Sequence, residues 1–168
     1  MIGYSEVLQT MAAMIIFSMI MMNANQMIHR NTVLHVDGEL EQQVISIGQE
    51  IIEEARTKAY DRVTYNSSMP PTMIPEGFTP SSDFPNNKER HQFIAFEDYH
   101  EYADTIRTSH GDFFIDVEVF YVDDTNYSHI TAQSTFKKIE VNITSDFLRS
   151  GDQPRNYKLE FIRNYYAE

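Results

Sequence analysis

The sequence predicts an α+β protein in which a long N-terminal helix, first hydrophobic and then amphipathic, packs on a C-terminal antiparallel β-sheet. Three observations predict this class. Residues 7–22 carry no charge, so this segment must be buried in lipid or against other subunits. Residues 40–59 repeat apolar side chains every three or four positions, as one face of a helix does. From residue 113 onward apolar and polar side chains alternate, which is typical of half-buried strands.

The first element is an apolar helix near the N-terminus. A helix needs about 20 apolar residues to cross a bilayer. The segment from Val7 to Ile28 reaches that length if it tolerates six polar side chains, Gln9, Thr10, Ser18, Asn23, Asn25 and Gln26. Its strongly apolar core, 11–22, has the length of a secretory signal core, but no basic residue precedes it and no small-x-small cleavage site follows it. We expect a retained membrane helix, and a helix buried in a larger protein assembly is the alternative.

An amphipathic helix follows. Its apolar side chains lie on one face, at Leu40, Val44, Ile47, Ile51, Ala55 and Ala59. Acidic and amide side chains fill the opposite face. Because a glycine inside a helix costs about 1 kcal/mol relative to alanine, Asp37-Gly38 predicts a kink or a short break between the two halves.

Pro, Gly, Ser and Asn are dense from Asn66 to Arg90, and this density excludes long regular structure. We expect a surface loop, held to the body of the protein by four apolar side chains, Met73, Ile74, Phe78 and Phe84. The predicted organisation is therefore a hydrophobic helix at 1–30, an amphipathic helix at 31–61, a loop region at 62–111 and an antiparallel sheet at 112–168.

Three strands are expected in the last region. The first covers 113–122 and buries its odd positions, because Asp116 and Glu118 fall on even ones. The second runs from about 132 to 144. Its Phe136 is out of phase with Ile139, Val141 and Ile143, which predicts a β-bulge near Lys137-Lys138. The third covers 157–165. Short connections favour antiparallel pairing, and the apolar face of the amphipathic helix is the expected cover of the sheet.

The composition argues against several classes of function. A net charge of −12 over 168 residues disfavours binding to a phosphate backbone, so no nucleic-acid partner is expected. The chain has no cysteine, which excludes disulfides, thiol catalysis and cysteine-ligated metals. It also lacks a Gly-rich phosphate loop and a Gly-x-Ser-x-Gly elbow. We therefore expect a protein that is not an enzyme and that has no cofactor and no small-molecule substrate.

Three short segments contain residue types that bind metal ions. The string 35–39 combines one histidine with two acidic residues, and two histidines at 91 and 100 flank Glu97-Asp98. Neither has a second supporting cluster, so a solvated helix face is the preferred interpretation of 35–39 and no metal site is expected. The segment Asp123-Asp124-Thr125-Asn126 has the oxygen ligands of a weak calcium site, but its composition favours a turn between strands.

Two stretches resemble a known family. In Gly3-Tyr4-Ser5-Glu6, a glycine, an aromatic residue, a hydroxyl residue and a glutamate lead into the apolar helix. The run 45–61, which contains Ile51-Ile52-Glu53-Glu54-Ala55-Arg56 and ends in Tyr60-Asp61, is similar to the A-x-x-L-A-Q-x-x-L-E-E-x-R-x-x-x-Y-D run of minor pilins. Together with the helix-on-sheet architecture, these residues resemble type IV pilins and type II secretion pseudopilins.

The resemblance implies a function in assembly. It implies cleavage between Gly3 and Tyr4, and a role for Glu6 in meeting the N-terminal amine of a neighbouring subunit; a location at the lipid headgroups is the simpler role for Glu6. The expected protein is a non-catalytic minor pilin or pseudopilin, anchored in the cytoplasmic membrane with its C-terminal domain periplasmic or extracellular. Its expected partners are other pilin-like or membrane subunits, which it contacts through the N-terminal helix.

The chain departs from the family pattern at two points. Only Met1-Ile2 precede Gly3, without a basic residue, and Glu6 lies three residues past the processing point instead of the usual five. An uncleaved single-pass accessory subunit of a membrane complex is therefore the alternative function. A secreted ligand-binding β domain, cleaved near Ala24, is a third hypothesis.

Overall fold

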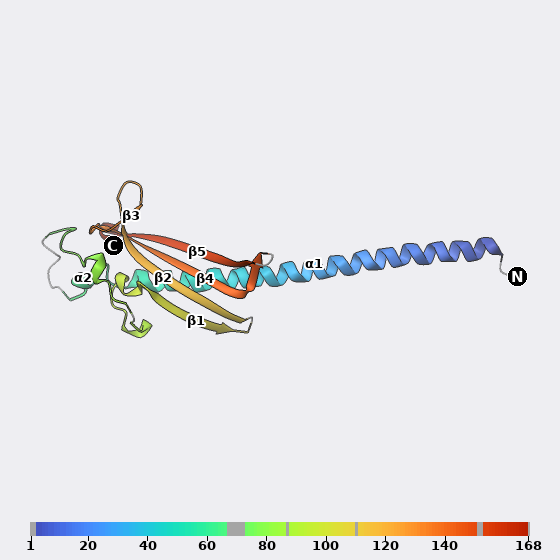
Figure 1. Cartoon of the computed structure of the whole chain (residues 1–168), viewed down its shortest axis with the longest axis horizontal. Coiled ribbons are helices and arrows are strands. Elements are labelled where there is room, and N and C mark those ends of the chain that lie inside the picture. Colours follow the sequence, from blue (N-terminus) through green and yellow to red (C-terminus); the bar gives the residue numbers. More distant parts are fainter. Residues whose placement is uncertain (1–2, 67–72, 87, 110, 151–152, 168) are drawn as a thin grey trace. The chain divides into compact units, whose positions relative to one another are not determined.

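The computed structural model describes residues 3–66, 73–86, 88–109, 111–150 and 153–167 (Figure 1). The fold is α+β, as predicted. It comprises the helices α1 (Tyr4–Thr57) and α2 (Arg62–Asn66) and the strands β1 (Tyr102–Thr108), β2 (Gly111–Val122), β3 (His129–Ile130), β4 (Phe136–Ser150) and β5 (Gln153–Asn164). Short 3-10 helices cover Ser81–Asp83, Arg90–Gln92, Phe96–Tyr99 and Tyr165–Ala167. The chain divides into two compact units, Met1–Glu41 and Gln42–Glu168.

Helix α1 is continuous over 54 residues, so the break predicted at Asp37-Gly38 is wrong. A Cβ added at Gly38 would meet nothing within 4 Å, so no packing contact requires a glycine there. The helix continues through Gly38 because the energetic cost of one glycine is small. A single glycine costs about 1 kcal/mol, and a long helix that has already formed propagates through such a position.

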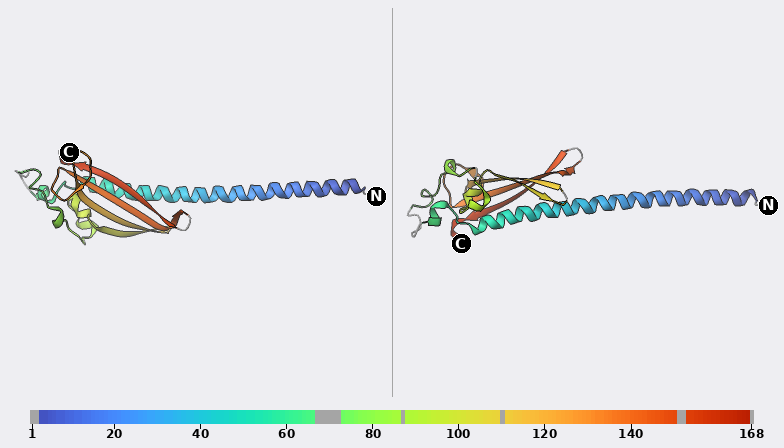
Figure 2. Two further views of the ribbon diagram at one scale, coloured as in Figure 1. Left: turned by 45° about the horizontal axis from the view of Figure 1, so that its top comes forward. Right: turned by 90° about the horizontal axis from the view of Figure 1, so that it is seen from below.

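In the second unit, the C-terminal part of α1 covers one face of the antiparallel sheet, as predicted (Figure 2). Its apolar side chains at Val44, Ile51 and Ala55 are buried. Gly48 marks the closest approach, because a Cβ at this position would lie 2.8 Å from Cδ2 of Leu159 in β5. A larger side chain here would require the Leu159 side chain to move, so the helix packs closely on β5 at this position.

The strand order is β1-β2-β4-β5, with β3 pairing with β2, and all pairs are antiparallel. The predicted alternation in β2 is confirmed. Its odd positions from Phe113 to Tyr121 are buried, whereas Asp116 and Glu118 are exposed. The register places Val117 opposite Val141 of β4, so two buried valines face each other across the centre of the sheet.

Strand β1 lies in the region expected to be a loop. It pairs with β2 from Tyr102↔Val117 to Thr108↔Gly111, at one edge of the sheet. None of its residues is fully buried. An edge strand without a buried face leaves no clear alternation in the sequence, which explains why the pattern did not predict it.

The bulge predicted at Lys137-Lys138 is wrong. Strands β4 and β5 pair without interruption from Phe136↔Asn164 to Thr144↔Asn156, and the register shift falls between Thr144 and Arg149. Phe136 is out of phase with the buried residues because it lies on the other face of the sheet. The buried position beside it is Lys137, which is completely buried. The prediction failed because it required Phe136 to share the buried face of Ile139, Val141 and Ile143, whereas Lys137 takes that position.

The segment from 73 to 86 is partly attached to the body. Phe78 and Phe84 are buried, as expected of residues that hold the loop down. Met73 is exposed and Ile74 is intermediate. Two of the four predicted anchors therefore hold the loop, and residues 67–72 and 87 of this predicted loop lie outside the described residues.

Candidate functional site

The surface of α1 before residue 40 is the first candidate. Every residue from 3 to 39 is exposed within the chain. The exposed side chains include a run of large apolar ones, Val7, Leu8, Met11, Met14, Ile15, Ile16, Phe17, Met19, Ile20, Met21 and Met22. Soluble monomers rarely leave so much contiguous apolar surface in water. This surface therefore requires a nonaqueous neighbour, either lipid or other protein.

Helix α1 is long and apolar enough to cross a membrane, and none of its qualifying segment is buried within the chain. This exposure distinguishes the segment from the core helix of a soluble protein, which would be covered by its own fold. Membrane anchoring is consistent with the length and composition of the helix.

The polar side chains of this segment are of two kinds. The hydroxyls bond to their own helix: Thr10 Oγ1 donates to the Val7 carbonyl at 2.8 Å, and Ser18 Oγ donates to the Met14 carbonyl at 2.8 Å. Hydroxyls satisfied in this way are tolerated in hydrocarbon. The amides are exposed, at Gln9, Asn23, Asn25 and Gln26. In a membrane, amides of this kind favour hydrogen bonds to neighbouring helices.

The structure brings Gly3, Tyr4 and Glu6 together at the start of α1. The Gly3 carbonyl accepts hydrogen bonds from the backbone N–H groups of Glu6 at 3.0 Å and Val7 at 3.3 Å. Glu6 Oε2 accepts a hydrogen bond from the Gly3 N–H at 3.3 Å. This return bond from the third helical residue to the cap residue is half of a capping box. The carboxylate also lies at the positive end of the helix dipole. Glu6 thus has a local capping role in the uncut chain.

A buried ionic cluster is the second candidate site. The ammonium group of Lys137 donates to the Asp61 Oδ2 at 2.7 Å, to the Glu97 Oε2 at 2.9 Å and to the Tyr60 carbonyl at 3.0 Å. The side chains of the lysine and both acids have no solvent exposure. Three aromatic rings surround Nζ, with centroids at 4.7 Å for Tyr60, 5.2 Å for Tyr121 and 5.4 Å for Phe84. Three acceptors thus match the three ammonium protons, in an enclosure of aromatic rings that solvent does not reach.

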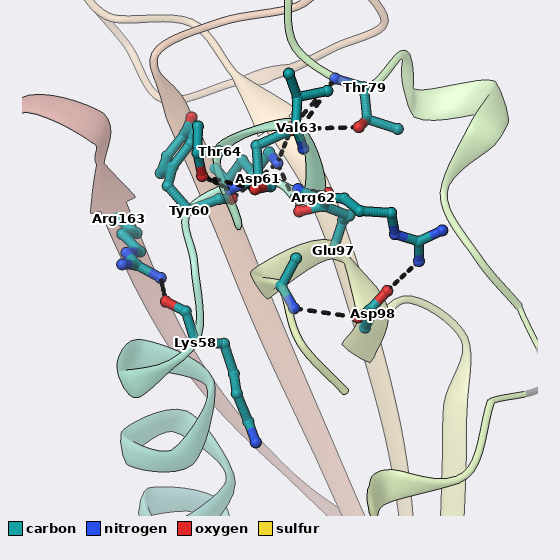
Figure 3. A network of polar contacts seen from close by, with 12 residues as sticks. Lys58, Tyr60, Asp61, Arg62, Val63, Thr64, Thr79, Glu97, Asp98 and Arg163 are labelled. Atoms are coloured by element: carbon teal, nitrogen blue, oxygen red, sulfur yellow. Dashed lines mark hydrogen bonds and ion pairs between the residues drawn. The ribbon is translucent and has the colours of Figure 1, made fainter. Parts of the chain in front are cut away.

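Asp61 is held by several donors besides Lys137 (Figure 3). Its Oδ1 accepts from Thr79 Oγ1 at 2.8 Å and from the Val63 N–H at 3.0 Å. Its Oδ2 accepts from the Thr79 N–H at 3.1 Å and from the Tyr121 hydroxyl at 3.3 Å. Burial alone would raise the pKa of Asp61, but the Lys137 charge and these hydrogen bonds more than offset burial and leave the pKa below its usual value.

Glu97 behaves in the opposite way. Its Oε1 accepts from the Arg62 N–H at 2.6 Å, while Oε2 faces Lys137. Burial raises the pKa of Glu97, Lys137 opposes the increase, and the neighbouring Asp61 charge adds to it, so that the pKa lies above its usual value. Lys137 lowers the pKa of both acids, so the difference comes from burial, which prevails at Glu97, and from the extra hydrogen bonds that Asp61 accepts. Glu97 is the group more ready to carry a proton.

The neighbouring Asp98 belongs to a second, more peripheral network. It accepts hydrogen bonds from the Ile94 N–H at 2.8 Å, the Lys88 Nζ at 2.9 Å and the Ala95 N–H at 3.1 Å, and it pairs with Arg62 (Figure 3). Burial raises the pKa of Asp98, but these donors more than offset it and lower the pKa. Both acids of the Glu97-Asp98 pair thus form ion pairs with basic side chains.

The metal candidates are not assembled as sites. His91 Nδ1 lies 3.2 Å from Glu89, and His100 Nδ1 accepts from the Val119 N–H at 3.3 Å. Within the described ranges no three His, Cys, Asp or Glu side chains lie close enough to hold a metal ion. The predicted turn at 123–126 is confirmed, because Asp123 Oδ1 accepts from the Thr125 N–H at 2.9 Å and the Asn126 N–H at 3.2 Å.

Sequence reasoning missed the Lys137 cluster. The available signal was parity, because Lys137 has the same parity as Ile139, Val141 and Ile143 and the buried face of β4 extends to it. The partners of Lys137 are 40 and 76 positions away in the chain, so no local pattern connects them. Comparison of the chain with protein-family models, with curated proteins and with solved structures yields no match.

Proposed function

We propose that this protein is a non-catalytic, membrane-anchored structural subunit, a minor pilin or pseudopilin, that acts in the assembly of a type IV pilus-like filament or a type II secretion system. The observation that carries the proposal is the exposed, uncharged surface of α1 over 7–22, on the same helix whose other end covers a folded sheet. The apolar part anchors the chain, and the α+β domain lies periplasmic or extracellular.

The polar groups of the anchor support assembly rather than anchoring alone. A helix that only crosses lipid gains nothing from exposed amides, whereas helices that pack together gain hydrogen bonds from them. Asn23 and Gln26 are three positions apart and therefore lie on the same side of α1. In this proposal the amides contact other subunits, while the hydroxyls remain bonded to their own helix.

The uncleaved single-pass accessory subunit is the second candidate, and one observation favours it. Glu6 caps its own helix through the Gly3 N–H. The uncut chain keeps that bond, whereas cleavage between Gly3 and Tyr4 removes its donor and frees the Glu6 carboxylate for an amine. The two functions therefore differ in the partner of Glu6.

The test uses protein from native membranes. After extraction of the membranes with alkaline carbonate, the anchored protein should stay in the pellet, and the mass of its N-terminal peptide should then be measured. A peptide that begins at Tyr4, with or without an added methyl group, supports the pilin function. A peptide that retains Gly3 rejects it in favour of the accessory subunit. Release of the protein by carbonate would overturn both.

A further inference from the structure

Three buried side chains of the second unit are arranged for a reaction with one another. Lys137 Nζ lies 2.7 Å from Asp61 Oδ2 and 2.9 Å from Glu97 Oε2, and all three side chains have no solvent exposure. We propose that Lys137 and Asp61 condense to form an intramolecular amide bond, with Glu97 as the proton carrier. The product is a covalent cross-link between β4 and the segment that follows α1.

The enclosure favours this bond for two reasons. Reacting groups that are held in contact behave as if they were present at a very high concentration. In bulk water the separated ions would still be preferred, but here two opposite charges are buried, at a cost in desolvation. The amide is neutral, and its formation releases a water molecule, so condensation removes the buried pair of charges. The rings of Tyr60, Phe84 and Tyr121 form the apolar wall around Nζ.

The two oxygens of Asp61 have different surroundings. Oδ1 accepts hydrogen bonds from Thr79 Oγ1, from the Val63 N–H and, at 3.3 Å, from the Thr79 N–H. Donors in this position stabilise the negative charge that develops on that oxygen when an amine attacks the carbon. Oδ2 contacts the amine directly and also accepts from the Thr79 N–H and the Tyr121 hydroxyl, so it is the oxygen placed to receive protons and leave. Glu97 also has one oxygen on the amine and one on a backbone N–H, but its Oε1 accepts only from the Arg62 N–H among the described contacts. The larger number of donors on Asp61 Oδ1 favours Asp61 as the acceptor.

Glu97 has the properties of a proton carrier. Its Oε2 contacts the Lys137 ammonium, and its raised pKa allows it to accept a proton and return it. In the reaction the lysine nitrogen bonds to Asp61 Cγ, and the Cγ–Oδ2 bond breaks. Two protons pass from Nζ through Glu97 to Oδ2, which leaves as water, and Glu97 returns to its initial state. No oxidant, metal or second substrate is required.

The cross-link would give the domain a covalent constraint of the kind that disulfides provide in other proteins. Without cysteine, the protein has no disulfide. An amide between residues 76 positions apart closes a long loop of the chain and restricts its unfolded state, as a disulfide does. The bond would join β4 to the short segment between α1 and α2, so it would resist separation of these two parts of the domain by a mechanical force.

A tryptic digest of the full-length protein tests the proposal. Trypsin does not cleave after an amidated lysine, so the peptide 59–62, which contains Asp61, should be recovered joined to the peptide 108–138, which contains Lys137. The joined species should weigh one water less than the sum of the two. Recovery of both peptides unlinked, with cleavage after Lys137, would overturn the proposal, and a link to Glu97 would overturn the assignment of Asp61.

Two variants separate chemistry from folding. Glu97→Gln keeps the shape and hydrogen-bonding ability of the side chain but cannot carry the proton, and it should slow cross-linking at least about 100-fold. Lys138→Arg changes the neighbouring lysine on the opposite face and should leave the link intact. Circular dichroism confirms that each variant is folded. A folded Glu97→Gln protein that cross-links at the wild-type rate would remove Glu97 from the mechanism, and if this variant does not fold, the wild-type digest still decides whether the bond exists.

Discussion

The apolar surface of α1 and the Lys137 cluster invert the usual distribution of side chains. Along 7–22 apolar side chains are outside, whereas at Lys137, Asp61 and Glu97 charges are inside. The two regions differ in where their interaction partners lie. The exposed surface depends on neighbours beyond this chain, while the buried charges have all their partners within it. The first region therefore requires a nonaqueous neighbour, and the second stabilises the domain.

The largest loss of stability is expected when a charge without a partner is buried in the sheet. Val117→Asp places a carboxylate at a fully buried site opposite Val141. The expected loss is about 4 kcal/mol or more, enough to abolish cooperative unfolding of the domain. The thermal unfolding curve of the full chain in detergent measures the effect. Asp116→Asn, one position away on the exposed face, is the control, and an unchanged curve for Val117→Asp would contradict the face assignment.

Removing the cation tests whether the buried charges are satisfied only as a set. Lys137→Met leaves two buried carboxylates without a partner, whether Lys137 is paired with them as a cation or joined to Asp61 as an amide, and should cost about 3–5 kcal/mol in the free energy of unfolding. Denaturant unfolding measures the loss. Adding Asp61→Asn and Glu97→Gln should recover part of the stability, because both uncompensated charges disappear. Lys138→Met, on the opposite face, should cost under about 1 kcal/mol. Equal losses at the two lysines would refute the role of the cluster.

A charge in the exposed apolar surface should affect the membrane and spare the fold. Ile16→Asp near the centre of 7–22 should weaken insertion by about 2.5–3.5 kcal/mol. Carbonate extraction should then release more protein, while the unfolding transition of the domain stays unchanged. Asn31→Asp, beyond the apolar run, is the matched control. Normal retention of Ile16→Asp would show that this surface does not lie in lipid.

Acid should weaken the domain through Asp98. Because its pKa is lowered in the folded state, its contribution to stability is complete above the unfolded value of 3.8 and is lost as the pH falls through the folded value. Asp98→Asn should cost about 1–3 kcal/mol at neutral pH, since a charged acceptor of several hydrogen bonds is removed. Stability measured between neutral and acidic pH should then be flatter than in the wild type. An identical pH profile would exclude Asp98 as the source.

The smallest effect on stability is expected at Glu6. Glu6→Ala removes the hydrogen bond to the Gly3 N–H and should cost the start of α1 about 0.5–1 kcal/mol, with the β domain intact. In the proposed filament the same change should reduce incorporation of the subunit. Quantifying the subunit in purified filaments checks this second effect. Full incorporation would restrict Glu6 to its capping role.

Local patterns predicted much of the architecture. The alternation along β2 and the helical periodicity at Val44, Ile51 and Ala55 each follow from the geometry of one element, and the structure has both. The density of Pro, Gly, Ser and Asn after residue 66 likewise predicted a region without long helices or strands. It did not reveal β1, because an edge strand needs only backbone partners and these lie in β2.

The sequence by itself determined that the chain carries an uncharged helix which its own fold cannot cover, since the absence of charge over 7–22 is a property of consecutive residues. It also determined the buried face of β2. Only the tertiary structure decided that Lys137 lies inside, because the groups that make this burial possible come from the segment that follows α1, from the 3-10 helix at Phe96–Tyr99 and from the loop at Thr79. A buried charge is stable only where its partners converge, and the fold brings those distant segments together.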